Sequence, residues 1–259
     1  MTQFLKVEMD GKVAVVTLNN PPVNILTSAL MKELEQEVDR LGADPAVRAV
    51  VITGSGPIFV AGADIKEIAT IQDVVTGTRM ASEGQRIFGK VAALGKPVIA
   101  AINGVCLGGG MELALACHLR VASDRAKMAQ PEINLGIIPG FGGTQRLARL
   151  AGRAKAAEWI LTGDNITPQD AKAAGIVNLV VPESEVLRQA VGLAKKITSK
   201  PAVAVRQALL ALSEGLDAPT LEAGLTVEAR HFGECCPSAD KVEGVKAFLE
   251  KRQPKFTDK

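Results

Sequence analysis

The chain has 259 residues, of which 47% are hydrophobic and 22% charged, and its formal net charge is +2. This composition is typical of a globular protein with one large domain, or with a core and a smaller appendage. Aromatic residues make up only 3%, tyrosine is absent, and lysine and arginine are spread along the chain. We therefore do not expect nucleic acid as the main partner.

The N-terminal segment lacks the charged region and apolar stretch of a signal peptide, and no apolar run is long enough to cross a bilayer. The four cysteines, Cys106, Cys117, Cys235 and Cys236, contain no C-x-x-C pair. We therefore expect a reduced, cytoplasmic protein with no membrane partner and no metal site.

The first half of the chain alternates strands and helices. Residues 4–9 and 12–18 alternate apolar and polar side chains around a D-G turn, which predicts a hairpin. Apolar residues spaced by three or four predict amphipathic helices at 27–41 and 74–94. Asp64 is expected to start a short helix. Apolar runs predict further strands at residues 48–53, 97–102, 119–122 and 127–129. This order predicts an α/β fold, with the site in loops at the strand ends.

From about residue 144 onward the pattern is almost entirely helical, with Thr167 and Pro168 suited to begin one of the helices. One strand is expected at 177–181. Further helices are expected at residues 183–199, 202–214, 219–233 and 239–251. A shift in composition near residue 200 predicts a core domain at 1–200 and a C-terminal helical region at 201–259.

The stretch AINGVCLGGGMELALA, residues 101–116, combines an apolar run, three consecutive glycines and one carboxylate. Glycines allow close approach of the backbone to a ligand, and the free N–H groups at a helix start favour negative charge. The stretch therefore predicts a site for an anion or a developing oxyanion. Glu112 is unexpected there, because its helical neighbours are apolar.

Three glycine-bearing loops, at residues 54–63, 104–110 and 136–143, follow successive core segments. If they converge, they line one pocket with backbone groups. Glu112 lies beside the second loop and Glu132 leads into the third, and paired carboxylates can divide acid and base roles. Taken alone, Glu132 is more typical of a solvated or ion-paired side chain, and a glycine triplet is more typical of a turn than of a catalytic site.

Several other chemistries do not fit the sequence. The glycine run lacks the Gly-Lys-Ser/Thr ending of a phosphate loop and the spacing of a dinucleotide fingerprint. With only His118 and His231 present, a Ser-His-Asp triad or a histidine metal site is not expected. His118 fits a structural role, and Cys106 has no evident histidine partner that would make it a nucleophile.

Three segments resemble the signature blocks of the crotonase (enoyl-CoA hydratase/isomerase) superfamily. They are FVAGADIKEI at residues 59–68, NGVCLGGGMELALACHLRVAS at 103–123 and AQPEINLGIIPGFGGTQRL at 129–147. The resemblance extends over nearly the whole chain. It implies a spiral core of repeated ββα units followed by a helical trimerisation region, in a homo-oligomer that is a trimer or a dimer of trimers.

The resemblance also implies an acyl-CoA thioester as substrate, with no separate cofactor and no metal. The thioester carbonyl would accept hydrogen bonds from the N–H groups of Ala61 and Gly109. The acyl-CoA would contact a set of residues from all three loops, namely Ala61, Gly62, Ala63, Asp64, Ile65, Gly109, Pro131 and Gly140. Gly140 matches the glycine whose N–H helps to hold the reacting water.

Both glutamates of superfamily hydratases are present, at Glu112 and Glu132, so the resemblance implies an enoyl-CoA hydratase. It would add water to trans-2-enoyl-CoA to give 3-hydroxyacyl-CoA, with a preference for short chains. Glu112 would activate the water and Glu132 would protonate the α carbon. The alternatives are a Δ3,Δ2-enoyl-CoA isomerase, a hydratase of a cyclic acyl-CoA, and a non-catalytic or RNA-binding member of the superfamily.

Overall fold

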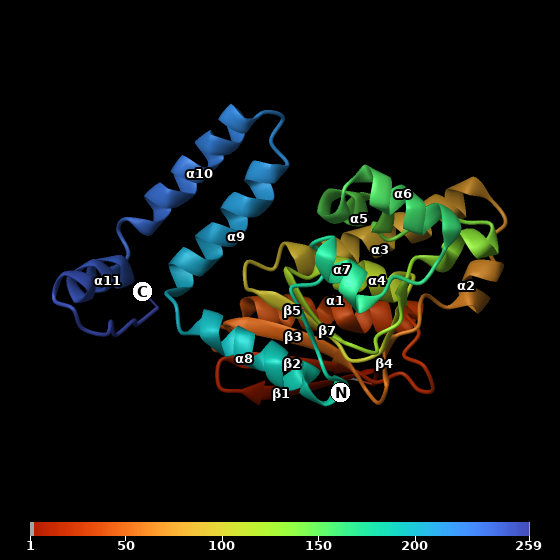
Figure 1. Cartoon of the computed structure of the whole chain (residues 1–259), viewed down its shortest axis with the longest axis horizontal. Helices are drawn as coiled ribbons and strands as arrows, with labels where there is room; N and C mark the ends of the chain where they lie inside the picture. Colours follow the sequence, from red (N-terminus) through yellow and green to blue (C-terminus); the bar gives the residue numbers. More distant parts are fainter. Residues whose placement is uncertain (1–2, 259) are drawn as a thin grey trace.

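The computed structural model describes residues 3–258 and shows two sheets with helices packed on them (Figure 1). The larger sheet has six strands in the order β1 (Leu5–Asp10), β2 (Val13–Leu18), β3 (Ala49–Gly54), β5 (Val98–Ile102), β7 (Leu119–Ser123) and β9 (Leu179–Val181). The smaller sheet consists of β4 (Ile58–Val60), β6 (Val105–Leu107) and β8 (Met128–Ala129). Only β1 and β2 pair antiparallel; the other pairings are parallel.

Helices follow the strands in a repeating order. The first half contains α1 (Ser28–Ala43), α2 (Ile65–Ala69), α3 (Val74–Ala92), α4 (Gly109–Ala116) and the 3₁₀ helix η1 (Pro131–Leu135). The second half contains α5 (Gly143–Ala151), α6 (Arg153–Thr162), α7 (Pro168–Ala173), the 3₁₀ helix η2 (Glu183–Glu185), α8 (Val186–Thr198), α9 (Ala202–Leu216), α10 (Leu221–Cys235) and α11 (Ala239–Leu249). Strands β3, β5 and β7 of the large sheet are each followed by one strand of the small sheet and then by helix, which is the expected spiral of ββα units.

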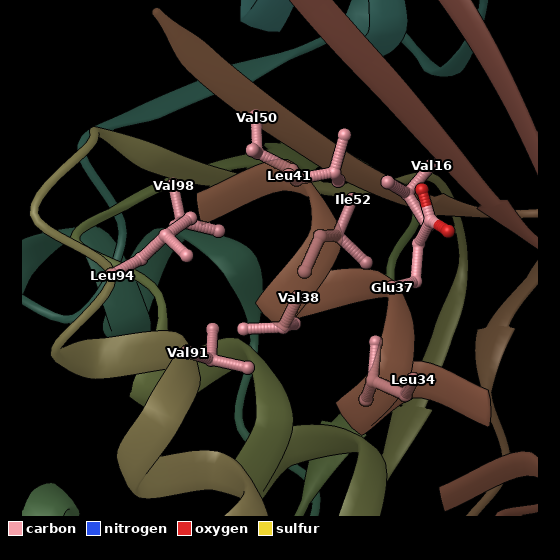
Figure 2. A pocket seen from close by; sticks show the side chains of 10 residues that line it. All are labelled: Val16, Leu34, Glu37, Val38, Leu41, Val50, Ile52, Val91, Leu94 and Val98. Carbon is pink, nitrogen blue, oxygen red and sulfur yellow. The ribbon is translucent and has the colours of Figure 1, made fainter. Parts of the chain in front are cut away.

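The two faces of the large sheet are covered by different helices. On one face, α1, α3 and α4 build the main apolar core. Figure 2 shows part of it, where side chains from α1 and α3 meet those of the sheet around a small void of about 10 Å³. Glu37 is the one acidic side chain labelled there, and it is paired with Arg40. On the other face, α8 places Val186, Ala190 and Ala194 against the sheet.

The last three helices extend away from the sheets (Figure 1). Helices α9 and α10 pack against each other as a hairpin, and Gly224 lies so close to α9 that a Cβ there would stand 3.0 Å from the Gly215 oxygen. The division of the chain at residue 200 stays a prediction. No helix within residues 3–258 is both long enough and apolar enough to cross a membrane.

The differences from the predicted elements lie mostly in short segments. Strands β4 and β6 lie inside stretches predicted as loops, because three-residue strands are too short to show a period. The helix predicted at 183–199 is divided into η2 and α8. Thr167 and Pro168 begin α7 as predicted, with the Thr167 hydroxyl accepting from the Asp170 N–H.

Candidate active site

The three glycines at the start of α4, residues 108–110, allow the backbone to approach its neighbours closely. Gly108 has φ +50°, which disfavours other residues, and a Cβ there would lie 3.0 Å from Oε1 of Glu132. A Cβ at Gly110 would lie 2.4 Å from the Val60 oxygen. The start of α4 therefore packs closely against Val60 of β4 on one side and Glu132 on the other. The N–H of Gly109, the first residue of the helix, is one of its free donors.

The structure contradicts the choice of Ala61 as the second donor of an oxyanion site. The Ala61 N–H donates to the carbonyl of Val23 at 3.2 Å, so it is already occupied. Two residues later, the Ala63 N–H has no acceptor among residues 3–258. The Ala63 nitrogen lies 3.4 Å from the point where a Cβ on Gly109 would stand. Ala63 and Gly109, rather than Ala61 and Gly109, therefore bring two free N–H groups together.

Glu112 lies in the first turn of α4 and is 2% exposed. One of its oxygens, Oε1, accepts hydrogen bonds from the N–H groups of Phe141 at 2.7 Å and Gly143 at 2.8 Å. Gly143 is the first residue of α5, so the carboxylate lies at the starts of two helices, where negative charge is favoured. The other oxygen, Oε2, accepts no hydrogen bond from residues 3–258 and is available to a ligand or water.

Burial raises the pKa of Glu112 from 4.5 to about 7. The hydrogen bonds from Gly143 and Phe141 and the positive charge of Arg146 act in the opposite direction, but desolvation of the carboxylate outweighs them. A carboxyl group with a pKa near neutrality can exchange a proton in either direction at physiological pH, which general acid–base catalysis requires.

Glu132 lies in η1, which Pro131 begins, and its side chain is half-buried. With its amide nitrogen toward Glu132, Gln130 donates to both carboxylate oxygens, at 3.0 and 3.1 Å. Gln130 is fully buried, and a Cβ at Gly143 would lie 3.0 Å from its Cδ. The amide is therefore confined by the same loop that binds Glu112, and it orients the Glu132 carboxylate.

Burial, with a smaller contribution from the negative charge of Glu112, raises the pKa of Glu132 to about 7. Ionisation of Glu112 therefore favours the protonated form of Glu132. Around neutral pH this coupling favours the state with one proton shared between the two sites. One group is then a base while the other is an acid.

The remaining predicted site residues each make different contacts. The Gly140 N–H has no acceptor among residues 3–258, while the Gly140 carbonyl accepts from the Gln85 side chain at 2.8 Å. Gly62 has φ +127° and its carbonyl accepts from Leu26. Asp64 caps α2 by accepting from the Lys66 N–H at 2.8 Å. Ile65, the first residue of α2, is 51% exposed.

A cleft of about 870 Å³ lies between α1, α2 and α3 and includes Phe141 in its wall. The Phe141 ring packs edge-on against Phe88, at 5.8 Å between centroids, and fits against α3 because Gly84 has no side chain. Lys66 and Arg79 also line the cleft. The wall also contains Glu35, Glu67 and Glu83, so basic and acidic side chains both line the cleft beside Phe141, the residue whose N–H binds Glu112.

Two residues considered as alternatives are structural. His118 accepts from the Val98 N–H through Nδ1 at 3.0 Å and contacts the Ala92 carbonyl through Nε2 at 3.0 Å, as expected for a structural histidine. Cys106 is fully buried, and burial raises its thiol pKa, which disfavours a nucleophilic role. Within residues 3–258 no three His, Cys, Asp or Glu side chains are grouped to hold a metal. The metal-free reaction stays a prediction.

Sequence reasoning did not identify Gln130 or Arg146 as parts of the site. Gln130 stands two residues before Glu132, and a buried amide at that position is a weak signal in one sequence. Arg146 follows Gly142 by four residues, the spacing at which a side chain turns back over a helix start. Only the folded loop shows that these side chains contact the segments that hold Glu112 and Glu132.

Comparison with known proteins relates this site to one family. The family model described as Enoyl-CoA hydratase/isomerase matches residues 8–259. A probable enoyl-CoA hydratase of Bacillus subtilis is 43% identical, over 97% of this chain and 98% of that protein. A short-chain-enoyl-CoA hydratase of Clostridium acetobutylicum is 43% identical, over 95% of this chain and 94% of that protein.

Solved structures of enoyl-CoA hydratases also resemble this chain over nearly its whole length. The crystal structure of an enoyl-CoA hydratase from Bacillus anthracis superposes with a TM-score of 0.93 at 39% identity, and the match covers 99% of this chain and 100% of that one. Both the family match and these similarities cover almost the full length of the chain. The chain therefore belongs to the enoyl-CoA hydratase/isomerase family.

Proposed function

We propose that the protein is an enoyl-CoA hydratase, which adds water reversibly across the double bond of trans-2-enoyl-CoA to give 3-hydroxyacyl-CoA. The observation that carries the proposal is the pair of glutamates beside the start of α4, the buried Glu112 and the half-buried Glu132, each with a pKa raised to about 7. They lie beside free backbone donors at the start of α4. Family membership and the hydratase names of the relatives support the same activity.

The addition of water places negative charge on the thioester oxygen as an enolate forms. The N–H groups of Ala63 and Gly109 are free, close together and next to the positive end of α4, so they are suited to accept this oxyanion. Donors preorganised in this way contribute about 3–4 kcal/mol each to transition-state stabilisation. The glycine-rich start of α4 thus stabilises the negative charge of the enolate oxygen.

The two glutamates divide the proton transfers. Oε2 of Glu112, which is free of hydrogen bonds from the chain, removes a proton from water as its oxygen attacks the β carbon. Glu132, held by Gln130, delivers a proton to the α carbon. The free N–H of Gly140 is a further donor for the water. In the dehydration direction the two carboxyl groups exchange roles.

The acyl-CoA would occupy the cleft between α1, α2 and α3. Lys66 and Arg79 in its wall are suited to the phosphates of coenzyme A, and Phe141 to the acyl end. A preference for short acyl chains is supported by two relatives, one named a short-chain-enoyl-CoA hydratase and the other a crotonyl-CoA hydratase.

The protein is further proposed to form a trimer or a dimer of trimers through its C-terminal helices. Large apolar side chains of α9, α10 and α11 are exposed in the single chain, among them Leu216, Leu221, Phe232 and Phe248. Exposed apolar surface of this extent is typical of a subunit interface. A cytoplasmic location stays a prediction.

The test is a hydration assay with crotonyl-CoA, followed by analysis of the product. The enoyl-thioester absorbance should fall, and the product should be the 3-hydroxyacyl thioester. A Δ3,Δ2-isomerase would instead convert a 3-enoyl thioester without adding water. A panel of longer and cyclic enoyl-CoAs would define the preferred acyl group. No turnover of any of them would refute the proposed function.

A further inference from the structure

Arg146 is a half-buried cation on α5, and the reaction described above does not use it. Its guanidinium turns back under the loop before the helix, where Nη1 donates to the carbonyl of Phe141 at 2.9 Å. No carboxylate oxygen of residues 3–258 lies within the 4.0 Å limit of an ion pair with it. A buried arginine usually pairs with an acid, so its bond to a peptide carbonyl needs an explanation.

Phe141 connects this guanidinium to the active site. Its carbonyl accepts from Arg146, while its N–H donates to Oε1 of Glu112 at 2.7 Å. The residue between Phe141 and Gly143 is Gly142, at φ +110°. A Cβ there would lie 2.2 Å from Nη1 of Arg146. A side chain at position 142 would therefore displace the guanidinium from this place.

The charges around Glu112 come from two neighbouring elements. Glu132 on η1 contributes a negative charge, and Arg146 on α5 contributes a positive charge that lowers the pKa of Glu112 against the effect of burial. Cys117 and Arg149 in turn act on Arg146. Burial lowers the pKa of Arg146, and the negative charge of Glu112 counteracts this shift.

We propose that Arg146 is a positioning residue for Glu112. Its guanidinium holds the Phe141 carbonyl so that both N–H donors of the loop stay on the carboxylate, and its positive charge favours the ionised form of that carboxylate. This inference rests on the proposed function, because it assigns Arg146 to the base of that reaction. A merely structural arginine would stabilise the loop without affecting the protonation of Glu112.

The first readout is the titration of the Glu112 carboxyl group without substrate. Infrared difference spectra against Glu112→Gln would follow its band from about pH 5 to 9. Arg146→Met should raise the titration midpoint by about one pH unit, because a neighbouring opposite charge has been removed. Arg149→Met is the matched control, since it removes an exposed cation from the same helix and should leave the midpoint unchanged.

The second readout is the pH profile of kcat/KM for crotonyl-CoA. In Arg146→Met the acidic limb should move to higher pH by the same amount, with roughly a tenfold loss of kcat at neutral pH and little change in KM. Arg146→Lys keeps the charge and should retain the wild-type midpoint, whereas Arg146→Gln keeps a donor without the charge and should not. If Arg146→Met does not fold, the comparison of Arg146→Lys with Arg146→Gln tests whether the positive charge sets the titration midpoint.

Equal midpoints for Arg146→Lys and Arg146→Gln would overturn the proposal, as would a wild-type midpoint in Arg146→Met. Failure of the proposed function is a separate result. In that case wild-type protein would not hydrate any enoyl-CoA, while the infrared titration would still show whether Arg146 controls Glu112.

Discussion

At the scale of single residues, Glu112 and Glu132 have similar carboxyl groups but different surroundings. Glu112 is held through one oxygen by two backbone N–H groups, which leaves the other oxygen open. Glu132 is held through both oxygens by the amide of Gln130. Burial raises both pKa values to about 7, and the negative charge of ionised Glu112 favours a proton on Glu132. This asymmetry supports a base at Glu112 and an acid at Glu132.

Replacing either glutamate by glutamine is expected to reduce kcat by at least about 100-fold, because each loses a proton transfer of the reaction. Glutamine nearly conserves the shape of the side chain, so KM should change much less. Steady-state hydration of crotonyl-CoA measures both constants. Glu158→Gln is the control, since this exposed glutamate pairs only with Lys155 on α6. Near wild-type kcat in both active-site variants would contradict the assigned roles.

The raised pKa of Glu112 also predicts how stability depends on pH. The folded protein binds this proton more tightly than the unfolded chain, whose value is 4.5. The stabilisation is complete below pH 4.5 and is lost as pH rises toward about 7. Above that pH the ionised, buried carboxylate destabilises the fold by about 1–3 kcal/mol.

Glu112→Gln removes this titration while retaining an acceptor for the Phe141 and Gly143 N–H groups. The variant should therefore be more stable than wild type at pH 8, by up to about 3 kcal/mol, and the difference should shrink at pH 5. Denaturant unfolding at both pH values measures the change. If the variant is less stable than wild type by the same amount at pH 5 and at pH 8, the prediction is wrong, because the ionised carboxylate would then stabilise the fold.

At the scale of elements, α4 is the helix around which the site is arranged. All eight of its residues are buried, and its first turn faces β4, the loop before α5 and Glu132. Because α4 and α5 both begin at this point, their free N–H groups are directed at one small volume. Short strands β4 and β6 bring the loops together, which is why those loops line one site.

The close contact of α4 with β4 can be tested with Gly110→Ala. The new methyl group would lie 2.4 Å from the Val60 oxygen, so the helix start must shift, at a cost of about 1–3 kcal/mol or more. Gly192→Ala on α8 is the matched control, since its Cβ would meet no heavy atom within 4 Å. That change should stabilise the protein by about 0.5–1 kcal/mol. Thermal unfolding of the two variants compares them directly.

At the scale of the whole molecule, the C-terminal helices differ from the rest. The core helices bury one face against a sheet, whereas α9–α11 extend outward and expose apolar side chains (Figure 1). On α10, Leu221, Leu225 and Phe232 follow a spacing of four and seven residues, so they lie along one side of the helix. They are 80%, 53% and 72% exposed. A stripe of this kind is expected to pack against another subunit.

Leu221→Glu combined with Phe232→Glu should dissociate the oligomer, because two charges would be buried in an apolar interface. Light scattering after size-exclusion chromatography would show a shift toward the mass of a single chain. Thr226→Glu adds one charge to an exposed position on another face of α10 and should leave the mass unchanged. An unchanged mass in the double variant would exclude this stripe from the interface.

The sequence by itself determined the order of the long elements and the family, and it led to the prediction of the two glutamates. Periodicity is a local property, so α1 and α3 were predicted within two residues of their observed ends, and the glycine run marked the start of α4. The predictions of Glu112 and Glu132 as the catalytic pair followed from the resemblance together with an acid among apolar neighbours.

Only the tertiary structure decided which backbone groups are free. Whether Ala61 or Ala63 offers its N–H depends on where Val23, far away in sequence, places its carbonyl. The contacts of Gln130 and Arg146 likewise form between segments that meet only in the folded chain. A hydrogen bond requires a donor and an acceptor at the right distance and angle. When the two lie far apart in sequence, the order of the residues does not show whether they meet.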